Sequence, residues 1–188
     1  MDRVSAAFDA VPRADFLPSR ERSRASYDGP LTIGCGQTNS QPRTVDDMLR
    51  LLEVRPGDRV LDVGAGSGWS TALLAQLTGA TGSVRGVELE PELAVWGADN
   101  LRRAKVPWAS LEPSIPGVLG LPAHAPYDRI LVSAEPNDLP GDLVDQLTDD
   151  DGRMVIPVAG RMVLVVRRGD ETEVTEHGYY RFVPLRRD

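Results

Sequence analysis

Hydrophobic and polar positions follow two different periods along this chain, and the period changes several times. Within residues 42–52, the apolar side chains Val45, Met48, Leu49 and Leu52 recur at helical spacing. Residues 59–63 instead form a short, nearly continuous apolar run of the kind found in buried strands. The two patterns then alternate. They predict strands at residues 59–63, 83–88, 109–112 and 128–133, and helices at residues 69–77, 91–104 and 139–147.

This alternation determines the expected fold class. Strands separated by helices are typical of a parallel sheet with helices on both faces. We therefore expect an α/β fold, Rossmann-like and doubly wound, with a mostly parallel sheet. The last part of the chain differs, because residues 153–158, 162–167 and 173–183 have the pattern of strands joined by short turns. These predict an antiparallel C-terminal addition to the sheet.

The two ends of the chain carry weaker patterns. The first forty residues look irregular, with a short helix expected around residues 4–10 and a turn-rich cap after it. The helix at 42–52 is expected to use Ser40 as its N-cap, with Pro42 in its first turn. Arg186 and Arg187 are expected to form a solvated end.

Composition narrows the class of protein. A chain of 188 residues with 41% hydrophobic and 26% charged residues suits one globular domain spanning residues 1–188. No apolar run approaches the roughly 20 residues that cross a bilayer, and the first residues lack the apolar region of a secretory signal. We expect a cytoplasmic monomer without a membrane partner. The net charge of −7 argues against nucleic acid as a partner, and a single cysteine with two histidines argues against a metal site.

The strand at residues 59–63 runs into three closely spaced glycines, Gly64, Gly66 and Gly68. Glycines at such a turn let the backbone approach a ligand where side chains would block it. The fingerprint of NAD-binding proteins would need glycine where Trp69 stands, so the loop is not of that type. Glu88 closes the next strand, about 20 residues after the loop, where a ribose-binding carboxylate is expected. These features predict a site for S-adenosylmethionine; the alternative is that the glycines only allow tight strand-to-helix packing.

Ligands of an open parallel sheet bind beyond the carboxyl ends of its strands. The glycine loop, Glu88 and the segments that follow the later strands should therefore line one crevice. Asp62, just before the turn, is expected to hydrogen-bond loop amides or the amino group of the methyl donor. The residues predicted to bind the cofactor are Asp62, Gly64, Ala65, Gly66, Ser67, Gly68, Glu88, Leu89 and Gly117.

Many segments of the chain, in order, resemble those of one enzyme family, the protein-L-isoaspartate O-methyltransferases. The matching segments are residues 10–13, 16–18, 30–34, 36–38, 40–42, 56–61, the glycine loop, 125–130, 152–153 and 181–185. The resemblance covers nearly the whole chain. The glycine loop alone is shared by methyltransferases in general, whereas the segment Gln37-Thr38-x-Ser40-Gln41-Pro42 is much more specific.

The resemblance implies an activity and a place for the acceptor. The family transfers a methyl group from S-adenosylmethionine to the α-carboxyl of an isoaspartyl residue in a damaged protein or peptide, and the ester then cyclises to a succinimide. Because a carboxylate with a pKa near 4 is already ionised at neutral pH, it needs alignment rather than a general base. Residues 1–55 are implied to form an N-terminal cap and acceptor-binding segment, with Ser40 as the catalytic residue. The implied substrate-binding residues are Thr38, Asn39, Ser40, Gln41 and Ser133.

The sequence departs from the family pattern at three positions. Pro116 stands where the family has an aspartate facing the adenine amino group, and proline cannot accept that hydrogen bond through its side chain; Glu112 or Ser114 could replace it. Glu135 would place a negative charge near the acceptor carboxylate, and Asn39 replaces a commonly apolar residue. Two alternatives therefore stay open: a methyltransferase for an aspartate of one dedicated peptide or protein, and a catalytically weak S-adenosylmethionine-binding accessory protein.

Overall fold

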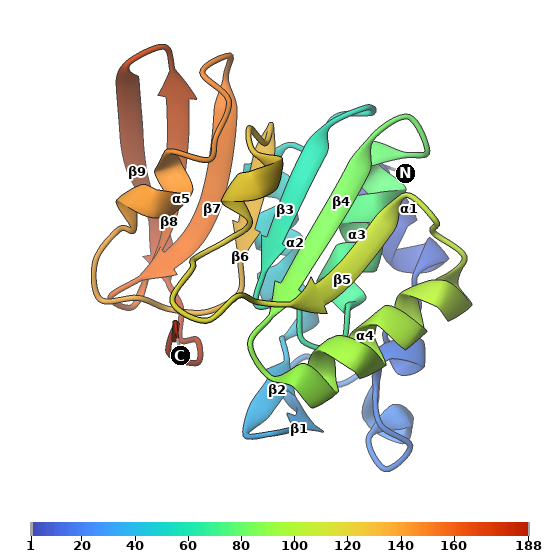
Figure 1. Ribbon diagram of the computed structural model, residues 1–188. Helices are drawn as coiled ribbons and strands as arrows, with labels where there is room; N and C mark the ends of the chain where they lie inside the picture. The colour runs from blue at the N-terminus through green and yellow to red at the C-terminus, as the bar shows by residue number, and fades with distance from the viewer. Residues whose placement is uncertain (1, 188) are drawn as a thin grey trace.

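The computed structural model describes residues 2–187, which form a seven-stranded sheet and a separate two-stranded hairpin (Figure 1). The strands are β1 (Leu31–Gly34), β2 (Gln37–Asn39), β3 (Arg59–Val63), β4 (Ser83–Glu88), β5 (Ala109–Pro113), β6 (Arg129–Val132), β7 (Gly152–Val158), β8 (Arg161–Arg168) and β9 (Glu171–Tyr179). The order in the large sheet is β5-β4-β3-β6-β7-β8-β9. The first five strands in this order run parallel to one another. Strand β8 is antiparallel to β7, and β9 is antiparallel to β8. The predicted fold class and its antiparallel C-terminal addition are confirmed.

Helices cover the two faces of the sheet unequally. They are α1 (Arg3–Ala10), α2 (Pro42–Leu52), α3 (Trp69–Thr78), α4 (Pro91–Ala104) and α5 (Gly141–Val144), with short 3-10 turns η1 (Arg13–Phe16), η2 (Arg22–Arg24) and η3 (Pro122–His124). Helices α1 to α4 bury apolar side chains in one core, whereas α5 and residues 114–127 cover the other. In Figure 1, α5 lies in front of the sheet, with α2 and α3 behind it. The second face carries so little helix because prolines interrupt residues 113–126.

Two C-terminal elements are shorter than predicted. The helix expected at residues 139–147 is reduced to α5, because the Gln146 side chain turns back and donates to the carbonyl of Asp142 (2.8 Å). The strand expected at residues 173–183 ends at Tyr179. Beyond it the chain leaves the sheet, since the amide of Phe182 donates to the carboxylate of Glu135 (3.1 Å).

The N-terminal part is more regular than predicted, because it contains the β1–β2 hairpin. Its turn places Gly34, Cys35 and Gly36 at φ angles of 106°, 51° and 71°. Left-handed backbone favours glycine, so the Gly-Cys-Gly run is the signal that could have indicated this turn.

The start of α2 differs from the prediction by one residue. Its N-cap is Gln41, which makes no side-chain cap bond, and not Ser40. Asp28, from the preceding loop, instead accepts a hydrogen bond from the amide of Arg43 (3.1 Å). The Ser40 hydroxyl is therefore not used to cap the helix.

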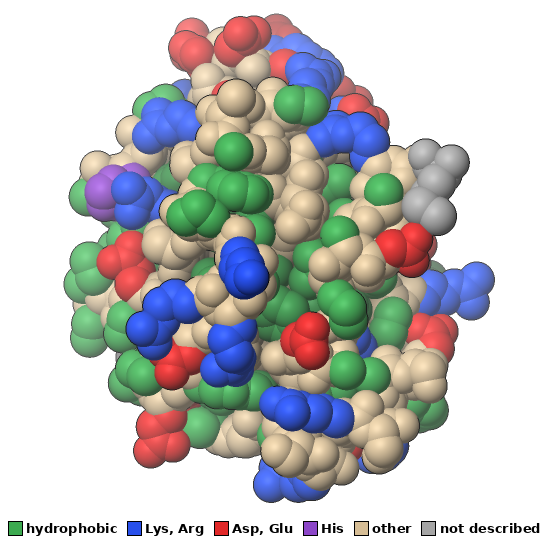
Figure 2. Space-filling model, turned by 90° about the vertical axis from the view of Figure 1, so that its right-hand side faces the viewer, with side chains coloured by type: hydrophobic (Ala, Val, Ile, Leu, Met, Phe, Trp, Pro, Cys, Tyr) green, Lys and Arg blue, Asp and Glu red, His purple; other side chains and the backbone are tan. Residues whose placement is uncertain are grey.

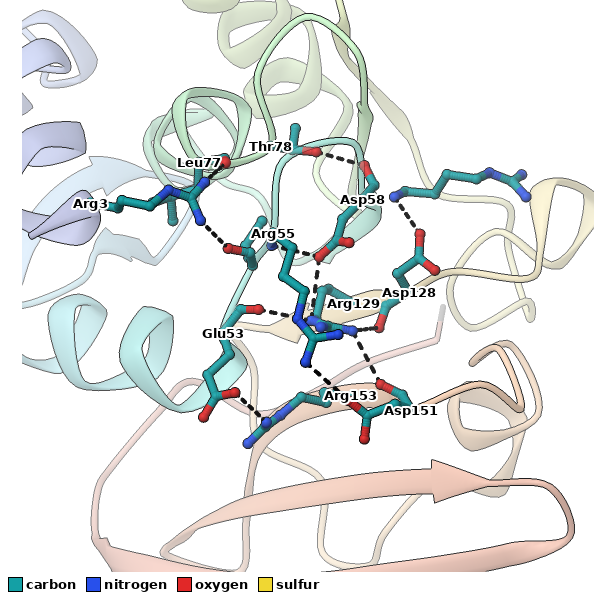
Figure 3. Close-up of polar contacts among 12 residues, drawn as sticks. Arg3, Glu53, Arg55, Asp58, Leu77, Thr78, Asp128, Arg129, Asp151 and Arg153 are labelled. Atoms are coloured by element: carbon teal, nitrogen blue, oxygen red, sulfur yellow. Dashed lines mark hydrogen bonds and ion pairs between the residues drawn. The ribbon is translucent and has the colours of Figure 1, made fainter.

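A polar cluster around Arg129 ties the sheet together at the amino-terminal ends of its strands (Figure 3). Arg129 is 2% exposed and donates to the carbonyls of Glu53 (3.1 Å), Asp128 (2.8 Å) and Asp151 (3.2 Å). Its guanidinium lies 3.4 Å from the carboxylate of Asp58. These contacts join the end of α2 to β6 and β7, so the opposite, carboxyl-terminal edge of the sheet is left for a ligand.

Charges are mixed on the surface. On the face drawn in Figure 2, basic side chains lie between acidic and hydrophobic ones and do not merge into one continuous basic surface. Within residues 2–187, every helix falls short of the length and apolarity needed for a bilayer crossing.

Candidate active site

A crevice opens beyond the carboxyl ends of the parallel strands. After β3 the chain adds β4 and β5 on one side and then returns to place β6 on the other, so the sheet has its topological switch between β3 and β6. The crevice encloses about 970 Å³, its open mouth included. It is lined by the glycine loop, the β1–β2 hairpin, the ends of β4 and β6, and residues 183–187.

The glycine loop turns through backbone conformations that favour glycine. Gly64, Gly66 and Gly68 have φ angles of 77°, 53° and 81°. Gly64 and Gly66 line the crevice, whereas Gly68 serves as the N-cap of α3. The loop therefore presents backbone, and not long side chains, to a ligand.

Side chains from two other elements hold this loop. The Glu88 carboxylate accepts hydrogen bonds from the amides of Gly66 (2.7 Å) and Glu90 (3.0 Å). Asn100 of α4 donates to the carbonyl of Ser67 (2.8 Å). Each Glu88 oxygen keeps a further lone pair, so the carboxylate can fix the loop and still accept from ribose hydroxyls.

Helix α4 approaches the loop very closely at Gly97. A Cβ at this position would lie 2.8 Å from the carbonyl oxygen of Gly66 and 3.3 Å from the carbonyl carbon of Ser67. Only glycine therefore allows this packing. Gly97 was not among the predicted site residues, although a glycine inside a predicted helix is a signal for close packing.

Asp62 lies behind the loop and does not line the crevice. Its side chain is fully buried, and Oδ2 accepts hydrogen bonds from the hydroxyls of Ser70 and Thr71 at 2.7 Å each. Oδ1 has no partner within the described part of the chain. Burial raises the pKa of Asp62 from its ordinary 3.8 to about 6. Its predicted contact with the loop amides or the methyl donor stays a prediction.

Replacing Asp62 with asparagine is expected to stabilise the protein at neutral pH. Between pH 4 and 6 the folded state binds more protons than the unfolded state, so stability falls as pH rises and the contribution is lost above the folded pKa of about 6. Asparagine carries no charge and keeps an oxygen for Ser70 and Thr71, so we expect a gain of about 1–2 kcal/mol at pH 7.5. Urea unfolding at pH 4.5 and 7.5 measures this. A variant that is less stable than the wild-type protein at pH 7.5 would contradict the raised pKa.

The segment predicted to bind the acceptor, residues 38–41, is held in place by the buried side chain of Arg13, which was not among the predicted site residues. Arg13 is 6% exposed and lies over the ring of Trp69, 5.5 Å from its centroid. Burial lowers the pKa of its guanidinium to about 10, which leaves it charged at neutral pH. Its carbonyl acceptors are those of Ala25, Tyr27, Gly29, Asn39 and Ser40, at distances of 3.4, 2.8, 2.9, 3.1 and 2.9 Å.

Asn39 connects this segment to the glycine loop. It is 4% exposed, its Oδ1 accepts from Nε of Arg13 (2.6 Å), and its Nδ2 donates to the hydroxyl of Ser67 (3.1 Å). An apolar residue could make neither bond. Asn39, which stands where the family commonly has an apolar residue, therefore has two polar partners within this chain.

Thr38 and Ser40 flank Asn39 and both line the crevice. Arg13 holds the Ser40 carbonyl, and the hydroxyl is free of the helix cap predicted for it. Gln41 does not line the crevice, because its side chain bonds to the carbonyl of Asp28 (3.1 Å). Thr38 and Ser40 thus both bring a hydroxyl-bearing residue to the crevice, and the catalytic role of Ser40 stays a prediction.

Glu135 points away from the crevice. Its carboxylate accepts hydrogen bonds from the amides of Gly160 (2.8 Å) and Phe182 (3.1 Å). The negative charge expected near the acceptor is instead bound by backbone amides, and it fixes the course of the chain after β9.

The C-terminal strap, residues 183–187, lines the crevice and was not predicted from the sequence. Arg186 pairs with Glu90 beside α4, and Arg187 pairs with Asp142 of α5 (2.8 Å). The Arg187 carbonyl accepts from the amide of Gly117 (2.6 Å). Both arginines stay exposed to solvent, as predicted, but their ion pairs with Glu90 and Asp142, which tie the strap to α4 and α5, were not predicted.

Most of the predicted site residues come together. Those that line the crevice are Thr38, Asn39, Ser40, Gly64, Ala65, Gly66, Ser67, Glu88, Leu89 and Ser133. Those that do not are Gln41, Asp62, Gly68 and Gly117, which cap, support or join neighbouring elements.

The crevice suits an adenosyl ligand. A backbone loop and a carboxylate lie at the ends of adjacent strands, where ribose binds in such folds. Beyond them, the buried Ser114 hydroxyl has no hydrogen-bond partner within residues 2–187. A Rossmann-like sheet with this site defines an S-adenosylmethionine-dependent methyltransferase.

Comparison with known proteins defines the family. The profile described as Protein-L-isoaspartate(D-aspartate) O-methyltransferase (PCMT) matches residues 1–188. Curated protein-L-isoaspartate O-methyltransferases of Methanopyrus kandleri and Methanocella arvoryzae are both 43% identical; the alignments cover 98% and 94% of this chain and 83% and 95% of those proteins. The chain belongs to the protein-L-isoaspartate O-methyltransferase family.

Solved structures agree with the fold. A structure described as a putative protein-L-isoaspartate O-methyltransferase from Plasmodium falciparum, in complex with S-adenosyl-L-homocysteine, matches with a TM-score of 0.83 and 25% identity over 100% of this chain and 92% of that one. A further protein-L-isoaspartate O-methyltransferase structure gives a TM-score of 0.89 at 24% identity, over 98% of this chain and 61% of that one. The predicted cofactor, S-adenosylmethionine, is supported by the family match and by the structure in complex with S-adenosyl-L-homocysteine.

Proposed function

We propose that this enzyme transfers a methyl group from S-adenosylmethionine to the α-carboxylate of isoaspartyl residues in damaged proteins or peptides, with Ser40 as the catalytic residue. The observation that carries the assignment of Ser40 is its position. It lines the same crevice as the glycine loop, on a segment fixed by Arg13, and is not used to cap α2.

The acceptor side of the site orients a carboxylate. When bound, the cofactor supplies an activated methyl group on a positively charged sulfur. The acceptor carboxylate is ionised at neutral pH, so the protein need not remove a proton. The Ser40 hydroxyl can donate a hydrogen bond to one carboxylate oxygen and leave the other free to react. Alignment of this kind can lower a barrier by several kcal/mol.

The donor side of the site is pre-organised by contacts within the chain. Glu88 holds the amide of Gly66, Asn100 holds the carbonyl of Ser67, and Asn39 connects the Ser67 hydroxyl to the acceptor segment. The glycine loop, which forms the donor wall of the crevice, and residues 38–41, which form its acceptor wall, are thus joined through buried hydrogen bonds. Such a connection keeps the two reacting groups in a fixed relation.

Replacing Ser40 with alanine is expected to lower turnover and to leave nucleotide binding nearly intact. A hydrogen bond to a charged group contributes about 1.5–3 kcal/mol, which corresponds to a fall in kcat of about 10- to 100-fold. Methyl transfer to an isoaspartyl peptide measures turnover, and calorimetry with S-adenosylhomocysteine measures binding. Ser110→Ala, at an exposed position of β5, is the matched control. Equal losses of affinity and rate in Ser40→Ala would contradict a role on the acceptor side.

We propose that the enzyme works as a monomer in the cytoplasm. The support for a monomer is that both walls of the crevice, donor and acceptor, come from one chain. Light scattering at assay concentration tests this, and a dimer whose dissociation abolishes activity would refute it.

A further inference from the structure

The C-terminal strap, residues 183–187, crosses from one side of the sheet's switch point to the other. It is joined first to the segment after β6, because the amide of Glu135 donates to the carbonyl of Val183 (2.8 Å) and the amide of Leu185 donates to the carbonyl of Glu135 (2.9 Å). The next residue, Arg186, pairs with Glu90, which follows β4. Strands β6 and β4 are the two neighbours of β3. The strap therefore passes across the carboxyl end of β3, where the glycine loop begins.

The two parts of the strap are held by contacts of different kinds. Its base, residues 183–185, is fixed by these backbone hydrogen bonds and by Leu185, which packs against the apolar core that α5 covers. Its tip, Arg186 and Arg187, is held by two ion pairs whose arginine side chains are 46% and 50% exposed, and by a hydrogen bond from the amide of Gly117 to the Arg187 carbonyl (2.6 Å). An exposed ion pair changes an equilibrium by only about 1.4- to 5-fold, so the tip can detach while the base stays in place.

The tip borders both the crevice and the wall that shapes it. Arg186 and Arg187 line the crevice. The amide of Glu90, the partner of Arg186, donates to the carboxylate of Glu88 (3.0 Å), and the same carboxylate accepts from the amide of Gly66 (2.7 Å). The exchange of a ligand between the glycine loop and solvent therefore depends on where the tip lies.

We propose that this tip is a gate, which must leave Glu90 and Asp142 for S-adenosylmethionine to enter the crevice and for S-adenosylhomocysteine to leave it. The inference rests on the cofactor of the proposed function and adds how that cofactor is exchanged. Each contact that closes the gate joins two residues of the chain, so its loss destabilises the closed form equally with and without the cofactor. Association and dissociation should then become faster together, and the dissociation constant should change little.

The test measures the rate constants of S-adenosylhomocysteine binding by surface plasmon resonance and the dissociation constant by calorimetry. Arg186→Gln/Arg187→Gln removes both ion pairs. We expect its association and dissociation rate constants each to rise by about 2- to 20-fold, with a dissociation constant within about threefold of the wild-type value. Raising the salt from about 0.05 to about 0.5 M should speed up both steps more in the wild-type protein than in this variant, because salt screens exposed ion pairs.

An exchange of charges separates a gate from a general loss of stability. Arg187→Asp alone places two carboxylates together and should speed up both steps, whereas adding Asp142→Arg restores an ion pair and should reverse most of the increase. The matched control is Arg168→Gln, which removes an exposed pair with Asp151 (2.9 Å) at the amino-terminal edge of the sheet and should match the wild-type protein. Thermal unfolding checks that each variant is folded.

The outcomes for the gate and for the proposed function can be told apart. Wild-type rate constants in the double variant would overturn the gate. Faster dissociation alone, with a proportional loss of affinity, would also overturn it, because the tip would then be a fixed wall that contacts the ligand. Both results would leave isoaspartyl methyl transfer untouched. A wild-type protein that binds no S-adenosylhomocysteine would overturn the gate and the proposed function together, and failure of methyl transfer with the expected rate constants would count against the proposed function alone.

Discussion

Replacing Arg13 with methionine is expected to lower kcat/KM for an isoaspartyl peptide by about 100-fold or more and the free energy of unfolding by about 3 kcal/mol. The guanidinium satisfies five backbone carbonyls and the Oδ1 of Asn39, and it is almost fully buried. Methionine fills similar space but donates no hydrogen bond. The hydrogen bonds to the carbonyls of Gly29 and Asn39 are buried, so these acceptors would lose their partner and the segment around Ser40 should lose its fixed position.

The comparison for Arg13→Met is Arg20→Met, which removes the same charge from an exposed side chain. Methyl transfer, urea unfolding and hydrogen exchange of the amides in residues 25–40 give independent readouts. We expect faster exchange in that segment for Arg13→Met only. If both variants had wild-type activity and exchange, Arg13 would not organise the acceptor segment.

Replacing Gly97 with alanine is expected to weaken the binding of S-adenosylhomocysteine by about 10- to 100-fold and to destabilise the fold by about 1–3 kcal/mol. The new Cβ would lie 2.8 Å from the Gly66 carbonyl oxygen, so either α4 or the glycine loop must shift. A shifted loop no longer presents its backbone to the ligand as the wild-type loop does. Alanine favours a helix over glycine by about 0.5–1 kcal/mol, which offsets only part of the strain.

A second glycine-to-alanine variant provides the control for Gly97→Ala. Gly141, at the start of α5, has no neighbouring atom within 4 Å of the position that a Cβ would take, so Gly141→Ala should keep wild-type affinity. Calorimetry measures the affinity of both variants for S-adenosylhomocysteine, and thermal unfolding measures their stability. Unchanged affinity in Gly97→Ala would show that the close approach of α4 does not define the loop.

The periodic part of the chain could be predicted from sequence because each element carries its own pattern. The apolar run of β3, the glycines after it and the helical spacing of α2 are local signals, and they place the fold and the donor wall. The resemblance at residues 37–42 predicted which part of the chain binds the acceptor. For this reason Ser40 was predicted as a site residue, and it lines the crevice, whereas its predicted role as the helix cap was wrong.

The parts that could not be predicted depend on contacts between distant residues. Arg13 reaches carbonyls up to 27 residues away, and the Arg186–Glu90 pair joins residues 96 apart. Asp28 caps α2 from outside the helix, so no capping residue stands where the local pattern requires one. Nothing in the local sequence distinguishes such a buried arginine or a strap residue from a solvated one.

The three departures from the family pattern have different explanations in the structure. Asn39 and Glu135 make buried or half-buried hydrogen bonds within the chain, and neither introduces an unpaired charge near the acceptor. Pro116 is exposed and lies outside the crevice. The hydrogen bonds of Asn39 and Glu135 weaken the structural motive for a redirected acceptor.

The central claim is tested most directly by methyl transfer from labelled S-adenosylmethionine to two peptides of the same sequence, one with an isoaspartyl and one with an aspartyl residue. We predict transfer to the isoaspartyl peptide and none to its partner. Equal transfer to both, transfer only to the aspartyl peptide, or tight binding of S-adenosylhomocysteine without transfer to either would contradict it.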